Sequence, residues 1–326
     1  MGKVWDVYVT RMLPEQVIDL LKMHCNVELN PYDRIIARGE LLEKVKGKNA
    51  ILPMVTEKID AEVFDAAGSE CRIVANYGVG YNNVDIGEAT KRGIMVTNTP
   101  DVLTNATSEM AWALLFAVAR KIVEGDKFTR AGKYKGWSPK LFVGTEITGK
   151  TLGIIGAGRI GSAFAKKSIG FEMKILYNAA HRNEAFERET GAIFADRETL
   201  LRESDFISLH VPLQESTVHL ISTNEFKMMK NTAILINTAR GPVVDENALI
   251  EALRTGEIAG AGLDVFEREP EFNPELSKLE NVVIVPHIGS ATSEARLNMG
   301  MIAAESIIAA MNGEIPKTLV NRDIKL

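Results

Sequence analysis

Apolar runs of strand length alternate with segments of helical periodicity along the first hundred residues. Strands are expected at VWDVYVT, NAILPMVT, RIVANYGVG and IMVTNTP, and helices at PEQVIDLLKMH, KIDAEVFDAAG and VDIGEATKRG. The alternation of short apolar strands with helices is typical of parallel sheets joined by crossover helices. This part of the chain therefore predicts one α/β series.

A second series of the same kind begins at TLGIIGAGRIG, residues 151–161. Its further strands are expected at MKILYN, FISLHVP, TAILINTARG, GAGLDVF and NVVIVPHIGS, and a long last helix is expected at SEARLNMGMIAAESIIAAMNGEIP. A helix from about Asn105 to Gly125 precedes this series and is too apolar to lie on a solvated surface. We therefore expect that helix to be buried against another domain or another subunit.

Composition narrows the class of protein. The chain has 326 residues, enough for two domains, and its 46% hydrophobic and 25% charged residues are ordinary for a soluble globular enzyme. A formal net charge of −5 argues against nucleic acid or an anionic membrane as the main partner. Neither a membrane span nor the apolar stretch of a signal peptide is present, so a cytoplasmic location is expected. Cys25 and Cys71 are then expected to be reduced core thiols.

The segment TLGIIGAGRIG has the spacing of a dinucleotide-binding turn. Gly156 would make the tight turn, Gly158 would let a pyrophosphate approach the backbone, and Gly161 would let the helix pack on the strand. An acidic residue that binds the ribose hydroxyls is expected about 20 positions after Gly158, yet Asn178 stands there. Arg182 could attract a 2′-phosphate; alternatively it is a solvated loop charge and Asn178 bonds the ribose. NADP is therefore slightly favoured over NAD.

Three later strand ends carry residues of chemical interest. Ligands bind outside the carboxyl ends of parallel strands, and these ends present Arg240, Glu269 and His287. An arginine suits a carboxylate, a histidine transfers a proton near neutral pH, and a carboxylate beside it orients the ring. Together they suit hydride transfer to a carbonyl carbon. Taken alone, Glu269 in EREPE could be a solvated charge, and Arg240 a surface residue at a helix start. No histidine and carboxylate have metal-ligand spacing, so no metal is predicted.

Several of these motifs, in this order, resemble the D-isomer-specific 2-hydroxyacid dehydrogenase family. They are GAGRIG, HVPL, INTARG, GAGLDVFEREP and PHIGSAT, preceded by NYGVGYNNVD, ATKRGIMVTNTP and ATSEMAWALLFAVAR. Within that family the chain looks most like the glyoxylate/hydroxypyruvate reductase branch, chiefly through FTRAGKYKGWSPKLFVGTEITGKTLGI. The resemblance covers nearly the whole chain.

The resemblance implies two doubly wound parallel-sheet domains, with a Rossmann cofactor domain inserted into a flavodoxin-like substrate domain. The NAD(P)-binding domain would span residues 100–290, and the substrate-binding domain residues 1–99 plus 291–326. The active site would be the cleft between them, and closure would exclude water during hydride transfer. By the same resemblance, the apolar helix from Asn105 to Gly125 would be the dimer helix of a homodimer, although burial within one chain explains its composition equally well.

The resemblance also assigns residues. His287 would be the acid/base, Glu269 would pair with it, and Arg240 would bind the carboxylate and carbonyl oxygen of the substrate. Substrate-binding residues would be Leu52, Met54, Val79, Gly80 and Arg240, with Val79 and Gly80 offering their backbone N–H groups to the substrate carboxylate. Cofactor-binding residues would be Thr104, Gly156, Gly158, Arg159, Ile160, Asn178, Arg182, His210, Val211, Pro212, Thr217, Thr238, Ala239, Asp264, His287 and Gly289.

The expected activity is the NAD(P)H-dependent reduction of a small 2-oxo acid, glyoxylate or hydroxypyruvate, to the D-2-hydroxy acid. The same chemistry on 2-ketogluconate or a larger 2-oxo acid is the alternative, because sequence describes pocket walls poorly. A nucleotide-sensing corepressor without catalysis is a third interpretation, since one fold hosts many functions. Retention of Arg240, Glu269 and His287 together favours an enzyme.

Overall fold

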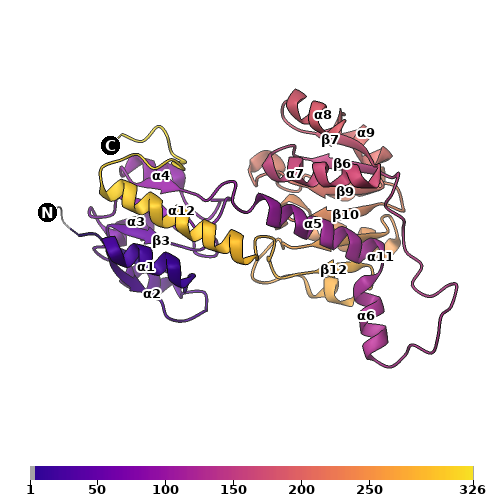
Figure 1. Cartoon of the computed structure of the whole chain (residues 1–326), viewed down its shortest axis with the longest axis horizontal. Coiled ribbons are helices and arrows are strands. Elements are labelled where there is room, and N and C mark those ends of the chain that lie inside the picture. Colours follow the sequence, from indigo (N-terminus) through magenta and orange to yellow (C-terminus); the bar gives the residue numbers. More distant parts are fainter. Residues whose placement is uncertain (1–3, 326) are drawn as a thin grey trace. The chain divides into compact units, whose positions relative to one another are not determined.

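The structure is a computed structural model that describes residues 4–325. The chain forms two compact units, which are described one at a time: unit 1 is Met1–Leu103 with Ala291–Leu326, and unit 2 is Thr104–Ser290 (Figure 1). Unit 1 is thus made from both ends of the chain, whereas unit 2 is continuous. That unit 1 binds the substrate and unit 2 the nucleotide stays a prediction.

Unit 1 has a five-stranded, wholly parallel sheet in the order β2-β1-β3-β4-β5. Its strands are β1 (Asp6–Val9), β2 (Asn26–Leu29), β3 (Ala50–Leu52), β4 (Ile73–Ala75) and β5 (Met95–Thr97). Its helices are α1 (Glu15–His24), α2 (Arg38–Lys44), α3 (Ala61–Ala67), α4 (Ile86–Lys91) and α12 (Ser293–Met311). This strand order is the flavodoxin-like one, as predicted.

The last helix, α12, belongs to the core of unit 1. It packs against α1 and β4, and a side chain on Gly300 would meet Val17 Cγ2 at 2.5 Å. The segment after α12 is bonded to the edge strand β5, because Asn321 Oδ1 accepts the Val96 N–H at 2.9 Å. Unit 1 therefore needs residues from both chain ends to complete its core.

Unit 2 has a seven-stranded parallel sheet in the order β12-β11-β10-β9-β6-β7-β8, which confirms the predicted Rossmann arrangement. Its strands are β6 (Thr151–Ile155), β7 (Lys174–Asn178), β8 (Ile193–Phe194), β9 (Phe206–Leu209), β10 (Ile234–Asn237), β11 (Gly260–Leu263) and β12 (Val282–Ile284). The strand order reverses between β6 and β9, and ligands bind at such switch points.

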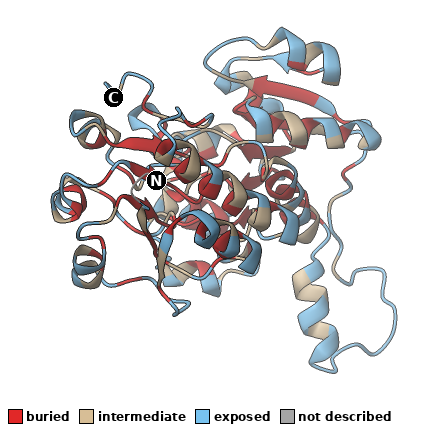
Figure 2. Ribbon diagram, turned by 60° about the vertical axis from the view of Figure 1, so that its left-hand side comes forward, coloured by how far each residue is buried: buried red, intermediate tan, exposed pale blue. Residues whose placement is uncertain are grey.

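Helices cover both faces of this sheet. They are α5 (Thr104–Ala119), α6 (Ile122–Arg130), α7 (Arg159–Ser168), α8 (Glu184–Thr190), α9 (Arg197–Glu203), α10 (Thr223–Met228) and α11 (Glu246–Thr255), with 3-10 turns η1 (Ile169–Phe171), η2 (Glu215–Thr217), η3 (Gly241–Val243) and η4 (Pro274–Lys278). Most strands are buried and are drawn red in Figure 2, whereas β2 and β8 are partly or fully exposed. Within the described residues, no helix combines the length and apolar character needed to span a membrane.

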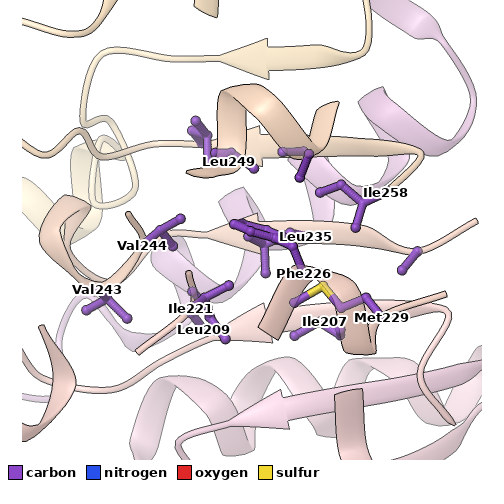
Figure 3. Close-up of a cluster of buried hydrophobic side chains, with 14 of the residues drawn as sticks. Ile207, Leu209, Ile221, Phe226, Met229, Leu235, Val243, Val244, Leu249 and Ile258 are labelled. Carbon is purple, nitrogen blue, oxygen red and sulfur yellow. The ribbon is translucent and has the colours of Figure 1, made fainter. Parts of the chain in front are cut away.

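Two apolar clusters hold the faces of unit 2. On one face Leu235 of β10 packs with Phe226 of α10 and Leu249 of α11, and the buried Val243 and Val244 belong to the same cluster (Figure 3). These two valines lie three and four positions after Arg240, so they anchor the segment that follows it. On the other face, the Trp112 ring of α5 stacks on Phe164 of α7, and its indole N–H donates to the Phe164 carbonyl at 3.0 Å.

The single helix predicted from Asn105 to Gly125 is wrong, because the structure has two helices there. Lys121 lies between α5 and α6 in the left-handed conformation, with φ of 52°. The Thr145 N–H donates to the Ala119 carbonyl at 2.8 Å and so takes the acceptor that a continuing helix would use. The apolar surface of α5 is covered within unit 2, by α7 and by β10 and β11.

Candidate active site

The turn after β6 has the shape that a dinucleotide requires. Gly156 has a φ of 102°, and a side chain on Gly161 would lie 2.1 Å from the Gly156 carbonyl oxygen, so the close approach of α7 to the strand needs glycine there. Gly158 is the N-cap of α7 and no side chain caps that helix. A Cβ on Gly158 would have no other atom within 4 Å, which leaves room in front of the helix N-terminus. These features fit a pyrophosphate.

The end of β7 presents the residues predicted to meet the ribose. Asn178 donates from Nδ2 to the Ala195 carbonyl at 2.9 Å. Arg182 is not a free loop charge, since its Nε and Nη2 each donate to Glu187 at 2.8 Å. The Tyr177 hydroxyl adds a third bond to Glu187 at 2.7 Å. The Arg182 and Tyr177 hydrogen bonds lower the pKa of Glu187 to about 2, so this carboxylate stays ionised at any working pH.

The loop after β9 begins with a neutral histidine. His210 lies against the Phe164 ring at 5.2 Å between centroids, and its Nε2 is 2.9 Å from Ser208 Oγ. Burial lowers the pKa of His210 to about 3, so its ring carries no charge near neutral pH. Val211 and Pro212 come next along the loop. Thr217 donates from its hydroxyl to the Pro212 carbonyl at 2.8 Å, so that hydroxyl braces the loop.

The turn after β10 carries Arg240 and is held by a residue that sequence reasoning missed. Asn237 ends the strand, accepts the Ala239 N–H on Oδ1 at 3.0 Å and donates from Nδ2 to the Arg240 carbonyl at 3.0 Å. Its only signal in the sequence is an amide at the last position of a strand. Thr238 Oγ1 is buried and has no hydrogen-bond partner among the described residues, so it is available to a ligand. Burial lowers the pKa of the Arg240 guanidinium, and the nearby Glu269 charge opposes that effect.

Glu269 and His287 form a hydrogen-bonded pair. His287 Nδ1 lies 2.6 Å from Glu269 Oε2, and the other carboxylate oxygen accepts the Phe266 N–H at 3.0 Å. Burial would raise the pKa of Glu269, but the His287 hydrogen bond and charge outweigh it and hold that pKa below its ordinary value. Because Nδ1 is engaged, Nε2 of the ring remains for a substrate.

Asp264 holds the segment directly after His287. Its carboxylate accepts the Ile288 N–H at 2.6 Å and the Gly289 N–H at 2.7 Å, and the residue is only 1% exposed. Burial raises the pKa of Asp264. His287 itself has a φ of 51°, so its backbone lies in the left-handed region. Asp264 therefore fixes the backbone that directs the His287 ring.

The predicted substrate residues of unit 1 lie at the ends of β3 and β4. Leu52 ends β3 and is fully buried, and Met54 lies two positions further on. The Val79 carbonyl accepts from Asn98 Nδ2 at 2.8 Å, and the Gly80 carbonyl accepts from Asn76 Nδ2 at 2.9 Å. Among the described residues the N–H groups of Val79 and Gly80 have no backbone hydrogen-bond partner. Their carbonyls are thus tied down while their N–H groups remain available.

The other predicted cofactor residues lie at two helix starts. Thr104 is the first residue of α5, and Arg159 and Ile160 are in the first turn of α7.

Between residues 4 and 325, no group of three or more His, Cys, Asp or Glu side chains is arranged to hold a metal ion. Cys25 and Cys71 are both buried and free, and burial raises the pKa of Cys71 to about 12.

Known proteins resemble this chain in sequence and in structure. Residues 112–289 match the model of the D-isomer specific 2-hydroxyacid dehydrogenase, NAD binding domain. The glyoxylate reductases of Thermococcus gammatolerans and Pyrococcus horikoshii are 55% and 56% identical to it over 322 residues, covering 98% of this chain and 96% of each relative.

A solved structure is also similar to this chain along nearly its whole length. The NADPH-dependent glyoxylate/hydroxypyruvate reductase of Sinorhizobium meliloti, in complex with NADP and malonate, matches with a TM-score of 0.86 and 29% identity, covering 98% of this chain and 97% of that one. The full-length matches agree on one family, and unit 2 carries Arg240, Glu269 and His287 after the ends of its strands β10, β11 and β12. The chain belongs to the D-isomer-specific 2-hydroxyacid dehydrogenases, a family of nicotinamide-dependent oxidoreductases.

Proposed function

We propose that this chain reduces glyoxylate or hydroxypyruvate to the corresponding D-2-hydroxy acid with NADPH or NADH. The observation that carries the proposal is the hydrogen-bonded pair of Glu269 and His287, with Arg240 near enough for its charge to act on the carboxylate. Full-length similarity to proteins named glyoxylate reductase supports the choice of substrate.

The proposed reaction assigns one task to each side chain. When bound, the reduced nicotinamide supplies a hydride for the carbonyl carbon. His287 holds a proton on Nε2, since Nδ1 faces Glu269, and delivers it to the carbonyl oxygen. Glu269 stabilises the protonated ring and fixes its orientation. Arg240 binds the carboxylate and the carbonyl oxygen with its fork of N–H donors.

The remaining residues hold the two ligands. The first turn of α7 would bind the pyrophosphate and Thr238 the buried part of the cofactor, while Asp264 keeps His287 in place. The N–H groups of Val79 and Gly80 would bind the substrate carboxylate, as backbone donors do in anion sites. The wall of the substrate pocket would be formed by Leu52 and Met54.

We propose that both cofactors are used, with NADPH slightly preferred. Asn178 supports this preference because a neutral amide does not repel a 2′-phosphate. Arg182 can bind that phosphate only in competition with its two hydrogen bonds to Glu187, which limits the preference.

We also propose a homodimer. The loop from 131 to 150 exposes apolar side chains, among them Tyr134 at 53%, Trp137 at 84% and Val143 at 65%. Exposed apolar surface of this kind is typical of an interaction site. Light scattering coupled to size-exclusion chromatography measures the mass directly, and a mass of one 35.8 kDa chain would contradict the proposal.

The test of function is a steady-state assay with glyoxylate and with hydroxypyruvate, each with NADH and NADPH. Turnover with either acid supports the proposal, and the ratio of kcat/KM values reports the cofactor preference. Turnover only with 2-ketogluconate or another larger 2-oxo acid would retain the chemistry and contradict the substrate. Nucleotide binding without turnover of any 2-oxo acid would contradict an enzyme and favour a sensor.

A further inference from the structure

The position of the Glu269 carboxylate depends on the loop that carries it. This loop, Glu267–Asn273, leaves the end of β11 and makes a tight turn in which the Glu271 N–H donates to the Arg268 carbonyl at 3.1 Å. The carboxylate itself has one backbone anchor, the Phe266 N–H, and its other oxygen faces His287. The distance between Glu269 and His287 therefore depends on where the loop is held.

One carboxylate outside the pair holds both ends of this loop. Glu246 accepts the Glu267 N–H on Oε2 at 3.2 Å and the Asn273 N–H on Oε1 at 2.8 Å. Its own N–H donates back to Glu267 Oε2 at 3.2 Å. The neighbouring Asn247 accepts from Asn273 Nδ2 at 3.1 Å. The loop is thus closed at its base by the first residues of α11.

The start of α11 is itself a firm support. Asp245 is the N-cap, accepting the Ala248 N–H at 3.1 Å and the Ser222 hydroxyl at 2.9 Å. His219 Nε2 lies 3.0 Å from Glu267 Oε1 and adds a second tie from another segment. Because these bonds hold Asp245 in place, they also hold the backbone of the next residue, Glu246.

Packing contributes to the position of the loop, since the rings of Phe266 and Phe272 lie 5.2 Å apart between centroids. The loop also borders a surface pocket of about 370 Å³, lined by Glu246, Asn247, Glu267, Arg268 and Phe272 among others. A loop that borders open space relies on its hydrogen bonds for its position, and bonds to an ionised acceptor are the strong ones.

We infer that Glu246 is a positioning residue, which sets the placement of Glu269 against His287 by closing the base of the Glu267–Asn273 loop. This inference rests on the proposed function of the Glu269–His287 pair. It differs from the ordinary role of an acidic residue in a first helical turn, which is to interact with the helix dipole and would leave the pair undisturbed.

The experiment compares Glu246→Gln and Glu246→Ala with Glu251→Gln as a matched control on the same helix. The side chain of Glu251 is 64% exposed, and its carboxylate lies 3.6 Å from Arg254 in an i,i+3 ion pair. With glyoxylate and NADPH, both Glu246 variants are expected to lower kcat about tenfold, less than the roughly hundredfold loss typical of a 1 Å misplacement. The alkaline fall of the rate should move to lower pH, and the cofactor dissociation constant should stay within twofold. The control should match the wild type.

A double variant shows whether Glu246 acts through Glu269. In a Glu269→Gln background, Glu246→Ala is expected to change kcat by less than about twofold, because the pair is already broken. If the two losses multiply, or if Glu246→Gln keeps the wild-type kcat and pH profile, the inference is wrong.

A readout that needs no turnover separates this inference from the proposed function. The proton on His287 Nδ1 should give a downfield signal in the proton NMR spectrum of the wild type that Glu269→Gln removes. Glu246→Gln is expected to shift or broaden this signal, and Glu251→Gln is not. An unchanged signal in Glu246→Gln would overturn the inference whether or not the wild type reduces any 2-oxo acid.

Discussion

Replacing Gly241 by alanine should separate Arg240 from the loop that carries Glu269. A Cβ at Gly241 would lie 1.8 Å from the Phe266 carbonyl oxygen, 1.9 Å from its carbon and 2.5 Å from the Glu267 nitrogen, all backbone atoms. Ordinary Cβ contacts begin near 3.4 Å, so the two segments must part by about 1.5 Å. Arg240 directly precedes Gly241, and Glu269 lies three positions after Phe266. A larger distance between Gly241 and Phe266 therefore also separates Arg240 from Glu269.

The size of the effect can be worked from this separation. Overpacking of this kind costs about 1–3 kcal/mol of folding free energy. At about 2–4 °C per kcal/mol for a domain of this size, the Tm should fall by roughly 2–12 °C. A 1 Å misplacement of reacting groups costs about a hundredfold in rate, so kcat should fall by at least about that factor at temperatures where the variant is folded.

Calorimetry and steady-state kinetics with glyoxylate measure both quantities. Gly170→Ala is the matched control, because a Cβ there has no other atom within 4 Å and the backbone φ is not positive. The control should keep the wild-type kcat and Tm. If Gly241→Ala kept kcat within threefold and Tm within about 2 °C, the close approach to Phe266 would have no mechanical importance and the reasoning would fail.

Three further predictions concern the pair and the cofactor. His287→Ala should lower kcat by about a hundredfold or more, the usual share of a general acid, while calorimetric titration finds NADPH affinity nearly unchanged; comparable turnover would remove His287 from the mechanism. Glu269→Gln should move the alkaline fall of the reduction rate to lower pH, because the carboxylate favours the protonated ring and that benefit is lost; an unshifted profile in rate measurements across pH would count against the pairing. Glu187→Gln should raise the NADPH-to-NADH ratio of kcat/KM about threefold or more, because it releases Arg182 from its two hydrogen bonds. Arg182→Ala should lower this ratio. Equal ratios in the wild type and both variants would show that Arg182 does not contact the 2′-phosphate.

The strand ends of unit 2 could be predicted because their strands are continuous apolar runs. Such runs as TAILIN and NVVIV indicate strands buried on both faces, and the residues directly after them must then lie at one edge of the sheet. The edge strands β2 (Asn26–Leu29) and β8 (Ile193–Phe194) were not predicted, because β2 is at most half-buried and both residues of β8 are exposed. The edge strands β5 and β12 were predicted. The break at Lys121 was also invisible, since it depends on Thr145, which is distant in the sequence.

In the candidate site, too, some residues have a local sequence signal and others depend on contacts that only the fold creates. The sequence analysis singled out Arg240, Glu269 and His287 because they follow the ends of buried strands and lie in motifs that resemble a known family; their roles stay a prediction. Glu246 was not singled out, because an acidic residue in the first turn of a helix is the common choice for the helix dipole. Only the fold shows that its carboxylate meets the Glu267 and Asn273 N–H groups.

The discontinuous make-up of unit 1 has a consequence for biosynthesis. During translation the continuous unit 2 is synthesised in full while unit 1 still lacks α12 and the segment that bonds to Val96. At about 5–20 residues per second, the missing stretch from Ala291 onward takes a few seconds to synthesise. Until α12 is made, the surface of β4 that it covers stays exposed. This apolar surface is then accessible to chaperones. The nascent chain thus matures from its middle outward, and its earliest-made part is the last to become native.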